Sequence, residues 1–394
     1  MKRILNVACR ILVGVLLTAV LVITVSGISP VYKFAPAKPF NGPDIFNPYA
    51  GVDSAAVWKR SLFHTHTRVK GPFNECEYWP GEVWNILQGF GYEIVTFSNH
   101  NRITDHPFDP ELQVNVYEHG INLFKFHKLV FGSKRVLPFD NILPFFSFQR
   151  QFQLDLLGKK SDFIQLNHPF RTEFTTKRMM ERLSGYQITE LDSGITTAQE
   201  YWDWALSAGH YSFGLANDDL HYPDRSERIA VRCNFLDCPS GRYGDLKDCL
   251  LSGRYYSMRI PDYGNGDWDV KREKNRNVPR IVKIGLEGAE IGMTLSAPAD
   301  SIVVTGSGHS TLAKAEGTAS ISYVLADDEP YARLTAFFPD GAVIYTNPFA
   351  RYDSSISDSP FHDFENRINW FLTIIYNLLL ILAAWGLVKL IRRL

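Results

Sequence analysis

The sequence predicts a mixed α/β chain: a largely parallel sheet or barrel, then a small β-rich, sandwich-like domain, with a transmembrane helix at each end. Between residues 59 and 258, short apolar runs alternate with segments of helical character, which is typical of βα units. After Pro279 the runs become strand-like and are separated by Gly, Pro and Asp, as in a small antiparallel sandwich. Residues 11–27 and 370–388 carry no charge, and about 20 such residues cross a bilayer.

The composition excludes several classes of protein. The 394 residues include 41 Lys and Arg against 42 Asp and Glu, so no strong positive field for binding nucleic acid is expected. Hydrophobic residues make up 45% of the chain and charged residues 21%, which excludes an intrinsically disordered protein. The length allows one large domain and a smaller one, each with its own core.

Basic residues lie outside both apolar segments, which predicts the topology of the chain. They are Lys2, Arg3 and Arg10 before the first segment, and Lys389, Arg392 and Arg393 after the second. By the positive-inside rule both termini are cytoplasmic, and the part between them is extracytoplasmic. The alternative for residues 1–30 is a cleaved signal peptide, but the apolar run is long and no small-residue cleavage site follows it closely.

The remaining chain divides by composition. We expect a connector over residues 31–58, a barrel over 59–258, a linker over 259–279, a β-rich domain over 280–360 and a C-terminal transmembrane helix over 369–389. The expected barrel strands are 61–65, 92–98, 128–132, 162–167, 186–191 and 211–217. The expected helices are 77–88, a segment from 177 capped by Thr175 or Thr176, and a segment from 198 capped by Thr196 or Thr197. Residues 339–343, PDGAV, predict a hairpin turn.

Histidines and acidic residues follow the predicted strands, where a barrel would gather them at one mouth. His64 and His66 are two residues apart, so on a strand both rings lie on one face and can chelate one ion. The other members are His100, Glu118, His127, His168, Asp219 and His221. Imidazole and carboxylate together suit zinc, manganese or iron. Each residue alone is a weak signal, but the set predicts a metal site.

The motifs FHTHT, SNHN, LNHPF and NDDLH, with Glu118 between the second and third, resemble the polymerase and histidinol phosphatase (PHP) superfamily of metal-dependent phosphoesterases over residues 59–258. The resemblance implies a distorted (β/α)7 barrel with two or three divalent metals. The segment YARLTAFFPDGAVIYTNPF also resembles, less specifically, the β extension of some PHP metallohydrolases. Asn99 stands where the family turn usually carries Asp, so the number of metals stays open.

The resemblance also implies roles for the residues of the motifs. A first metal would be held by His64, His66, Glu118 and Asp219, a second by Glu118, His127 and His168, and a third by His100 and His221. The neighbouring His119 competes with His127 for its role. Arg171 follows LNHPF and is a candidate catalytic residue beside Glu118 and Asp219, because its planar guanidinium can bind a phosphate. Weaker candidates are Arg102, Asp105, His106 and Glu190.

These expectations add up to a membrane-anchored metal-dependent hydrolase. Two divalent ions outweigh the charges of Glu118 and Asp219, so a small anionic ester is the expected substrate and water the nucleophile. The alternatives are hydrolysis of another ester, carbamate or amide, or a non-catalytic metal-binding envelope protein. Cys76, Cys233, Cys238 and Cys249 would face an oxidising compartment, and their pairing stays open, as do protein partners.

Overall fold

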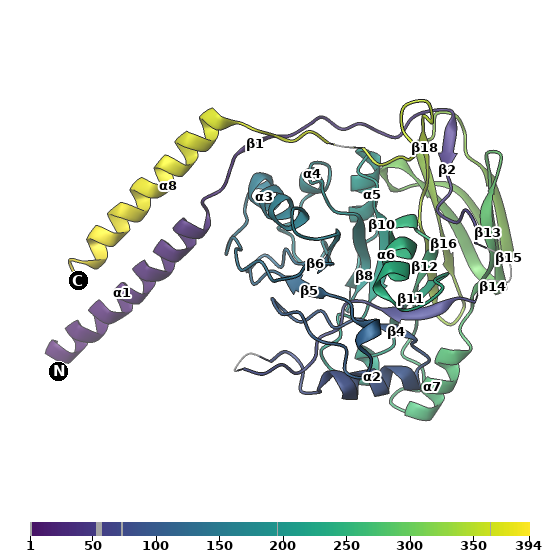
Figure 1. Cartoon of the computed structure of the whole chain (residues 1–394), viewed down its shortest axis with the longest axis horizontal. Coiled ribbons are helices and arrows are strands. Elements are labelled where there is room, and N and C mark those ends of the chain that lie inside the picture. The colour runs from purple at the N-terminus through teal and green to yellow at the C-terminus, as the bar shows by residue number, and fades with distance from the viewer. Residues whose placement is uncertain (1, 53–56, 72–73, 195, 363) are drawn as a thin grey trace.

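The computed structural model describes residues 2–52, 57–71, 74–194, 196–362 and 364–394. Figure 1 shows a globular part built of sheets and helices, with two long helices projecting from one side of it. The predicted mixture of α and β structure is confirmed. The pairing of the strands differs in part from the prediction.

The strands that carry the predicted site follow one another as neighbours in a ring. They are β3 (Lys59–Leu62), β4 (Ile94–Val95), β5 (Val116–His119), β6 (Lys128–Phe131), β7 (Phe163–Leu166), β8 (Ile188–Ser193) and β10 (Phe213–Asn217). Backbone pairing joins β3 to β4 and runs from β5 through β6, β7 and β8 to β10. Two isolated parallel bridges, Thr65 with Leu220 and His100 with Glu118, join these two groups at both ends.

The expectation of a largely parallel sheet is wrong for one stretch of this ring. The pairs β3–β4, β7–β8 and β8–β10 are parallel, but β5–β6 and β6–β7 are antiparallel. Residues 120–127, which join β5 to β6, are too few for the crossover that a parallel pair requires. The sequence analysis did not predict strand β5.

Helices surround the ring. They are α2 (Pro80–Gly89), α3 (Ser147–Gly158), α4 (Lys177–Met180), α5 (Glu200–Ser207) and α6 (Tyr243–Ser252), with short 3-10 turns at Pro110–Leu112, Ser226–Arg228 and Ser307–His309. Thr176 caps α4 as predicted, because its hydroxyl accepts a hydrogen bond from the backbone N–H of Met179. The predicted cap of α5 is wrong: Gln199 precedes that helix, and Thr196–Thr197 form strand β9, which pairs with β8.

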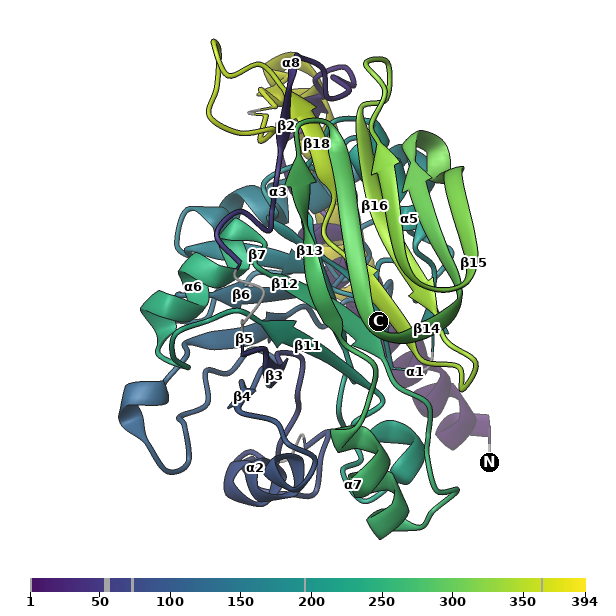
Figure 2. The ribbon, with the colours of Figure 1, turned by 90° about the vertical axis from the view of Figure 1, so that its right-hand side faces the viewer.

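The β-rich region continues into the ring. Its strands are β13 (Ile281–Glu287), β14 (Glu290–Gly306), β15 (Ser310–Val324), β16 (Tyr331–Phe337) and β17 (Val343–Thr346). They share one sheet with β12 (Tyr255–Arg259), β11 (Arg232–Leu236) and β3, as Figure 2 shows from the side. The predicted hairpin turn joins β16 to β17: the Phe338 N–H donates to Ala342 O at 2.9 Å, and Gly341 has a positive φ of 90°.

The segment 259–279, predicted as a linker, contains helix α7 (Trp268–Arg276). Asp267 caps this helix by accepting from the N–H groups of Asp269 and Val270. Its buried positions are polar. Lys271 donates to Asp262 at 2.9 Å, and Asn275 accepts from the buried guanidinium of Arg60 at 2.7 Å. A helix held by polar contacts gives no apolar periodicity, so the sequence pattern did not reveal it.

The projecting helices are α1 (Lys2–Ser26) and α8 (Trp370–Ile391), and both are long and apolar enough to cross a membrane. They lie side by side and antiparallel, so both termini are at the same end (Figure 1). At the other end, Asn377 is hydrogen-bonded to the backbone of Ser29 through both its oxygen and its nitrogen, at 3.1 and 3.0 Å. Beyond them, β1 (Tyr32–Lys33) pairs with β19 (Arg367–Ile368), and β2 (Asp44–Phe46) pairs with β18 (Phe349–Tyr352).

Candidate metal centre

His64 and His66 follow β3 and lie fully inside the protein. Their rings are 5.3 Å apart, as the alternation of side chains along an extended segment requires. The bridge between Thr65 and Leu220 fixes this segment beside the end of β10, which carries Asp219. The ends of β3 and β10, the first and last strands of the ring of strands, are therefore neighbours.

Two carboxylates meet these imidazoles. Glu118 Oε2 lies 3.2 Å from both His64 Nε2 and His66 Nε2. Asp219 Oδ1 lies 3.2 Å from His64 Nε2 and 3.4 Å from His66 Nε2. Four ligand atoms, two nitrogens and two oxygens, therefore converge on one point and could hold one metal ion.

The second oxygen of Glu118 faces a different set of imidazoles. Glu118 Oε1 lies 3.0 Å from His127 Nδ1 and 3.5 Å from His168 Nε2, while His100 Nε2 lies 3.1 Å from Oε2. His100, Glu118 and His127 form another group close enough to hold an ion. One carboxylate thus lies between two groups of imidazoles and could contribute an oxygen to each.

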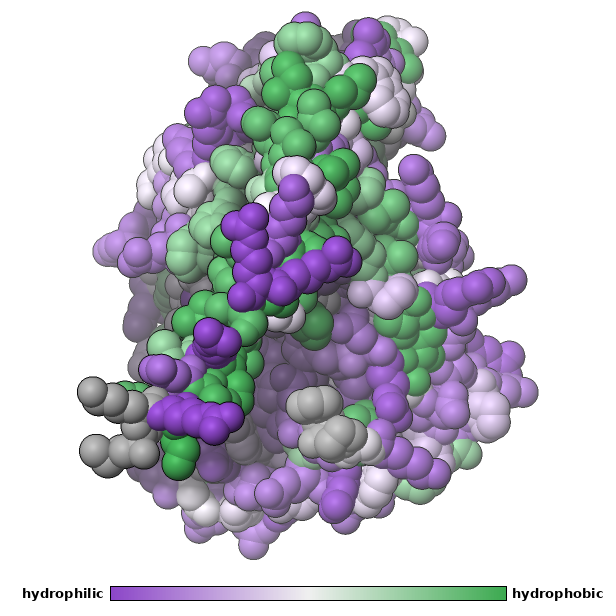
Figure 3. All heavy atoms as spheres, turned by 90° about the vertical axis from the view of Figure 1, so that its left-hand side faces the viewer, coloured by the Kyte–Doolittle hydropathy of each residue, from purple (hydrophilic) through white to green (hydrophobic). Residues whose placement is uncertain are grey.

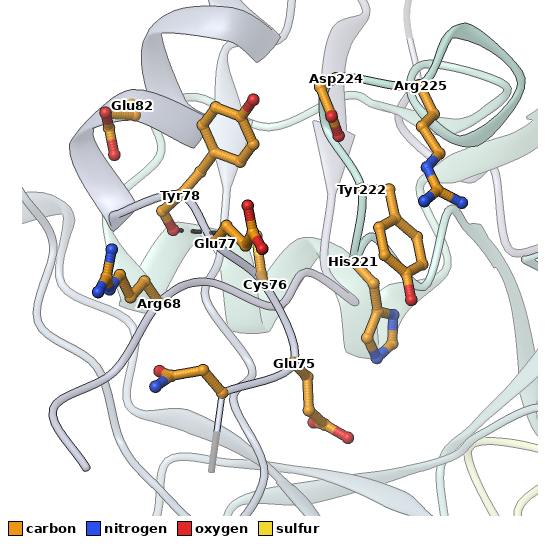
Figure 4. A pocket seen from close by; sticks show the side chains of 11 residues that line it. Arg68, Glu75, Cys76, Glu77, Tyr78, Glu82, His221, Tyr222, Asp224 and Arg225 are labelled. Carbon is orange, nitrogen blue, oxygen red and sulfur yellow. Dashed lines mark hydrogen bonds between the residues drawn. The ribbon is translucent and has the colours of Figure 1, made fainter. Parts of the chain in front are cut away.

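A third group contains a residue that sequence analysis missed. Glu75 Oε2 lies 3.4 Å from His66 Nδ1 and 3.5 Å from His100 Nε2, and with His66 and His221 it could hold an ion. Figure 4 shows the Glu75 and His221 side chains at the edge of a cavity of about 840 Å³ that also includes Arg68 and Arg225. Glu75 lies in a loop before α2 and outside any strand-end pattern, so only its position soon after the HxH motif could have indicated it.

Glu190, a weaker candidate from the sequence, holds the first ligands in place. Its Oε1 accepts from His64 Nδ1 at 3.0 Å and from Asn217 Nδ2 at 3.0 Å, and its Oε2 accepts from the backbone N–H of His168 at 2.9 Å. A proton on His64 Nδ1 leaves Nε2 free to act as a ligand. Glu190 therefore fixes both the tautomer and the direction of that ring.

Arg171 lies at the edge of the cluster, where its guanidinium forms an ion pair with Asp219 Oδ2. Its side chain is 43% exposed, so part of the guanidinium faces solvent at the mouth. The other weaker candidates have different surroundings. Arg102 and Asp105 are exposed, and His106 accepts from the Asp109 N–H at 2.9 Å, which shapes a turn.

His119 and His127, which compete for one predicted role, lie in different surroundings. His119 Nε2 lies 2.8 Å from the backbone oxygen of Phe139, on the far side of β5 from the cluster. His127 instead contacts Glu118 directly. Of the residues predicted as metal ligands, all lie in this one cluster: His64, His66, His100, Glu118, His127, His168, Asp219 and His221.

The backbone is strained at two of these positions. His168 has a φ of 24° and Asp219 a φ of 48°, values in a region that residues other than glycine rarely occupy. Such conformations persist where surrounding contacts hold them, and they cluster at functional sites. Here the Glu190 carboxylate holds the His168 N–H, and the bridge between Thr65 and Leu220 holds the chain after Asp219.

The cluster has the properties that a cation would satisfy. Among the residues that the structure describes, His64 Nε2, both nitrogens of His66 and His168 Nδ1 find no hydrogen-bond partner, and all are buried. Burial alone raises the pKa of Glu118, but the nearby His100 and His64 outweigh burial and hold it well below its usual range. Burial lowers the pKa of His127 to about 3, so that ring is neutral and available as a ligand. The residues present therefore fit divalent metal ions.

No protein-family model and no curated protein matches the chain. Among solved structures, it is similar to a two-domain protein from Bacteroides vulgatus that contains a predicted PHP-like metal-dependent phosphoesterase. The two share 13% identity with a TM-score of 0.37, over 79% of this chain and 98% of the other.

Proposed function

We propose that this chain is a membrane-anchored, metal-dependent hydrolase of phosphoesters, with its ring of strands forming a PHP-type barrel. The observation that carries the proposal is Glu118, whose two oxygens face two separate groups of imidazoles within 3.5 Å. A buried carboxylate between two such groups is suited to bridge two metal ions.

The ligand sets follow from the contacts. His64, His66, Glu118 and Asp219 would hold a first ion, and Glu118, His127 and His168, which meet at Glu118 Oε1, would hold a second. His100 and His221, with Glu75, are the candidates for a third. When bound, zinc, manganese or iron would supply an activated water and offset the charge of the phosphate. All of these ligands lie within residues 59–258, the proposed barrel. The sheet that contains β3 of the barrel continues into residues 280–360.

The chain's own polar groups would orient the substrate and the ligands. Glu190 holds the proton on His64 Nδ1, and Arg171 holds Asp219 by its outer oxygen. The exposed part of the Arg171 guanidinium can also bind an anionic oxygen that enters the mouth. A small anionic ester is therefore the proposed substrate.

For the membrane, we propose that α1 and α8 both cross the bilayer with the termini cytoplasmic and the globular part extracytoplasmic. The Arg10 guanidinium donates to the backbone oxygen of Leu394 at 3.4 Å, so the basic ends of the two helices are together. Their apolar side chains are mostly exposed, as expected for helices that face lipid. The positive-inside rule assigns the shared basic end to the cytoplasm.

The test uses the full chain in lipid nanodiscs, loaded with Zn, Mn or Fe. Metal content by elemental analysis and hydrolysis of phosphomonoesters, phosphodiesters and carboxylesters are measured together. His127→Gln should lower both metal content and phosphoester hydrolysis, whereas the matched His119→Gln should leave both near wild type, because His119 points away from the cluster. Bound metal without hydrolysis of any ester would favour a non-catalytic metal protein, and hydrolysis of carboxylesters alone would favour the alternative ester class.

A further inference from the structure

The segment that joins β5 to His127 exposes apolar side chains beside the metal centre. Residues 121–126 alternate, with Ile121, Leu123 and Lys125 exposed and the residues between them buried. Ile121 is 68% exposed and Leu123 is 66% exposed. Both line a cavity of about 640 Å³ that also includes His100 and His127. This cavity therefore places two exposed apolar side chains beside two imidazoles of the cluster.

These apolar side chains are held outward by a firmly built loop. The Asn122 side chain accepts from the Phe126 N–H at 2.9 Å and donates to Phe126 O at 3.0 Å. Asp140 Oδ2 accepts from the Ile121 N–H at 2.8 Å. The exposure of Ile121 and Leu123 is thus a consequence of specific hydrogen bonds in the loop.

The same loop is connected to the end of the first terminal helix. The Leu123 N–H donates to Ile142 O at 3.1 Å, and the Ile142 N–H donates to Ser26 Oγ, the last residue of α1, at 3.3 Å. Gln149 of α3 donates to Tyr376 of α8 at 3.2 Å. Two hydrogen bonds therefore separate the rim of the cavity from the point where a membrane helix ends.

Aromatic side chains lie between this loop and the terminal helix α8. Phe124 stacks on Phe174 at 3.8 Å and meets Phe145 edge-on at 4.7 Å. Near α8, Phe148 contacts the ring of Tyr376 at 5.2 Å. Phe145, Phe146 and Phe174 are about half exposed. Figure 3 views the face from which the terminal helices project, and it shows apolar side chains on the globular part beside them, around a hydrophilic hollow.

Such an apolar face is expected to enter the interface of the bilayer that the helices cross. The cavity next to Glu75 and His221 differs, because Arg68, Glu77 and Asp224 give it charged walls (Figure 4). Hydrocarbon would be disfavoured there. The cavity at Leu123 instead places two exposed apolar side chains beside the imidazoles and is joined through Ile142 to the end of α1, although Glu75 and Lys125 also line it.

We propose, building on the hydrolase function above, that the substrate is a lipid phosphomonoester of this bilayer. Its phosphate reaches His100 and His127 past Ile121 and Leu123, while its hydrocarbon stays in contact with the membrane. Lys125 is exposed at the same rim and offers a cation to the phosphate. Water adds to phosphorus and the bond from phosphorus to the ester oxygen breaks. The lipid alcohol takes one proton, and inorganic phosphate is released.

The test compares two substrates on the full chain in nanodiscs with Mn. One is a long-chain phosphatidic acid in the bilayer, and the other is the water-soluble dibutyryl phosphatidic acid. The double variant Ile121→Asn/Leu123→Asn should lower the ratio of long-chain to short-chain kcat/KM by about tenfold, since its apolar side chains no longer contact the lipid chains. The control Ile356→Asn, at a residue 81% exposed in the loop after β18, should leave the ratio unchanged.

A second measurement does not depend on activity. A fluorophore on Leu123→Cys, in a Cys9→Ser background, should be quenched by brominated lipids, whereas one on Ile356→Cys should not. If the double variant leaves the ratio of long-chain to short-chain kcat/KM unchanged, the proposal of a lipid substrate is wrong. Quenching at Leu123→Cys would in that case show that this face only contacts the membrane. Short-chain hydrolysis that His127→Gln abolishes would keep the hydrolase function in that case. If the metal-loaded wild type hydrolyses neither substrate, the hydrolase function fails and the lipid substrate fails with it.

Discussion

Arg171 forms an ion pair with Asp219 Oδ2, while Oδ1 of the same carboxylate lies 3.2 Å from His64 Nε2. One carboxylate thus connects the exposed guanidinium at the mouth with the most buried imidazole of the cluster. The sequence predicted that the Arg171 guanidinium binds a phosphate. In the structure, the guanidinium already has a protein partner, Asp219. Its free donors remain available to an anionic substrate.

We expect Arg171→Ala to lower kcat/KM for phosphoesters by about 10- to 100-fold, since a hydrogen bond to a charged group is worth roughly 1.5–3 kcal/mol. Neutral carboxylesters should lose much less, and metal content should not fall, because removing a cation does not weaken Asp219 as a ligand. Arg171→Lys keeps the charge without the planar fork and should recover only part of the rate. An equal loss on both ester classes would instead assign Arg171 a purely structural role.

Glu118→Gln tests the proposed bridging role of this carboxylate. The substitution preserves shape but removes the charge that both groups of imidazoles share, so we expect bound metal and activity to be lost together. A ligand that binds the folded state at 100 times its Kd stabilises it by about 2.7 kcal/mol. Chelation should therefore lower the Tm of wild type and leave the Tm of Glu118→Gln nearly unchanged. A variant that keeps a full complement of metal would contradict the bridging role.

Glu190 is proposed to act through His64, so its substitution should affect metal affinity more than folding. We expect Glu190→Gln to weaken metal binding or activity by about 10- to 100-fold, the usual effect of removing a partner behind a metal-bound imidazole. Titration with metal under competition by a chelator measures the affinity. Unchanged affinity together with lower thermal stability would show that the carboxylate only supports the local packing.

Much of the ring and of the cluster could be predicted because apolar runs end at polar residues. The run over 162–167 gives β7, and His168 follows it directly. Glu75 could not be predicted in this way, since it reaches the cluster from a loop and its role depends on tertiary proximity. The end of a strand is a local property of a sequence, but the approach of a distant loop is not.

The β-rich region shows a second limit. We expected Gly, Pro and Asp to separate the strand-like runs after Pro279, but β14 (Glu290–Gly306) continues through Pro298 and Asp300, with a register shift between Thr294 and Ala299. Pro298 lies within that shift, where a residue without an N–H is tolerated at a bulge. Pro298 therefore does not end the strand, although its residue type is typical of a strand boundary.

The proposed topology predicts which side of the membrane reacts with a label. In a Cys9→Ser background, the remaining cysteines are buried, so a maleimide should react chiefly with a cysteine placed at the exposed Ile356. We expect a membrane-impermeant maleimide to label Ile356→Cys in intact cells. Labelling that requires permeabilised cells would reverse the proposed orientation.

The last prediction concerns the contact between α5 and the β-rich sheet. Asp203 and Arg333 are both buried, and Asp203 Oδ1 accepts from Arg333 Nε at 2.8 Å and from the Tyr331 hydroxyl at 3.0 Å. Burial raises the pKa of Asp203, but the charge of Arg333 outweighs burial and holds it below its usual value. The ionised pair therefore stabilises the fold above the ordinary Asp pKa of about 3.9, and this stabilisation is lost as the pH falls below it.

Asp203→Asn leaves the Arg333 charge buried and unpaired, which should reduce the free energy of unfolding by about 3–5 kcal/mol at pH 7. Urea unfolding of the full chain in detergent measures the difference, which should shrink as the pH falls below about 4 because wild type loses the same charge. The matched control is Asp327→Asn, whose carboxylate pairs with Arg351 but is fully exposed, so a change within about 0.5 kcal/mol is expected. If the loss of unfolding free energy in Asp203→Asn stays constant with pH, the pair is not ionised. The loss would then come from the changed shape of the side chain.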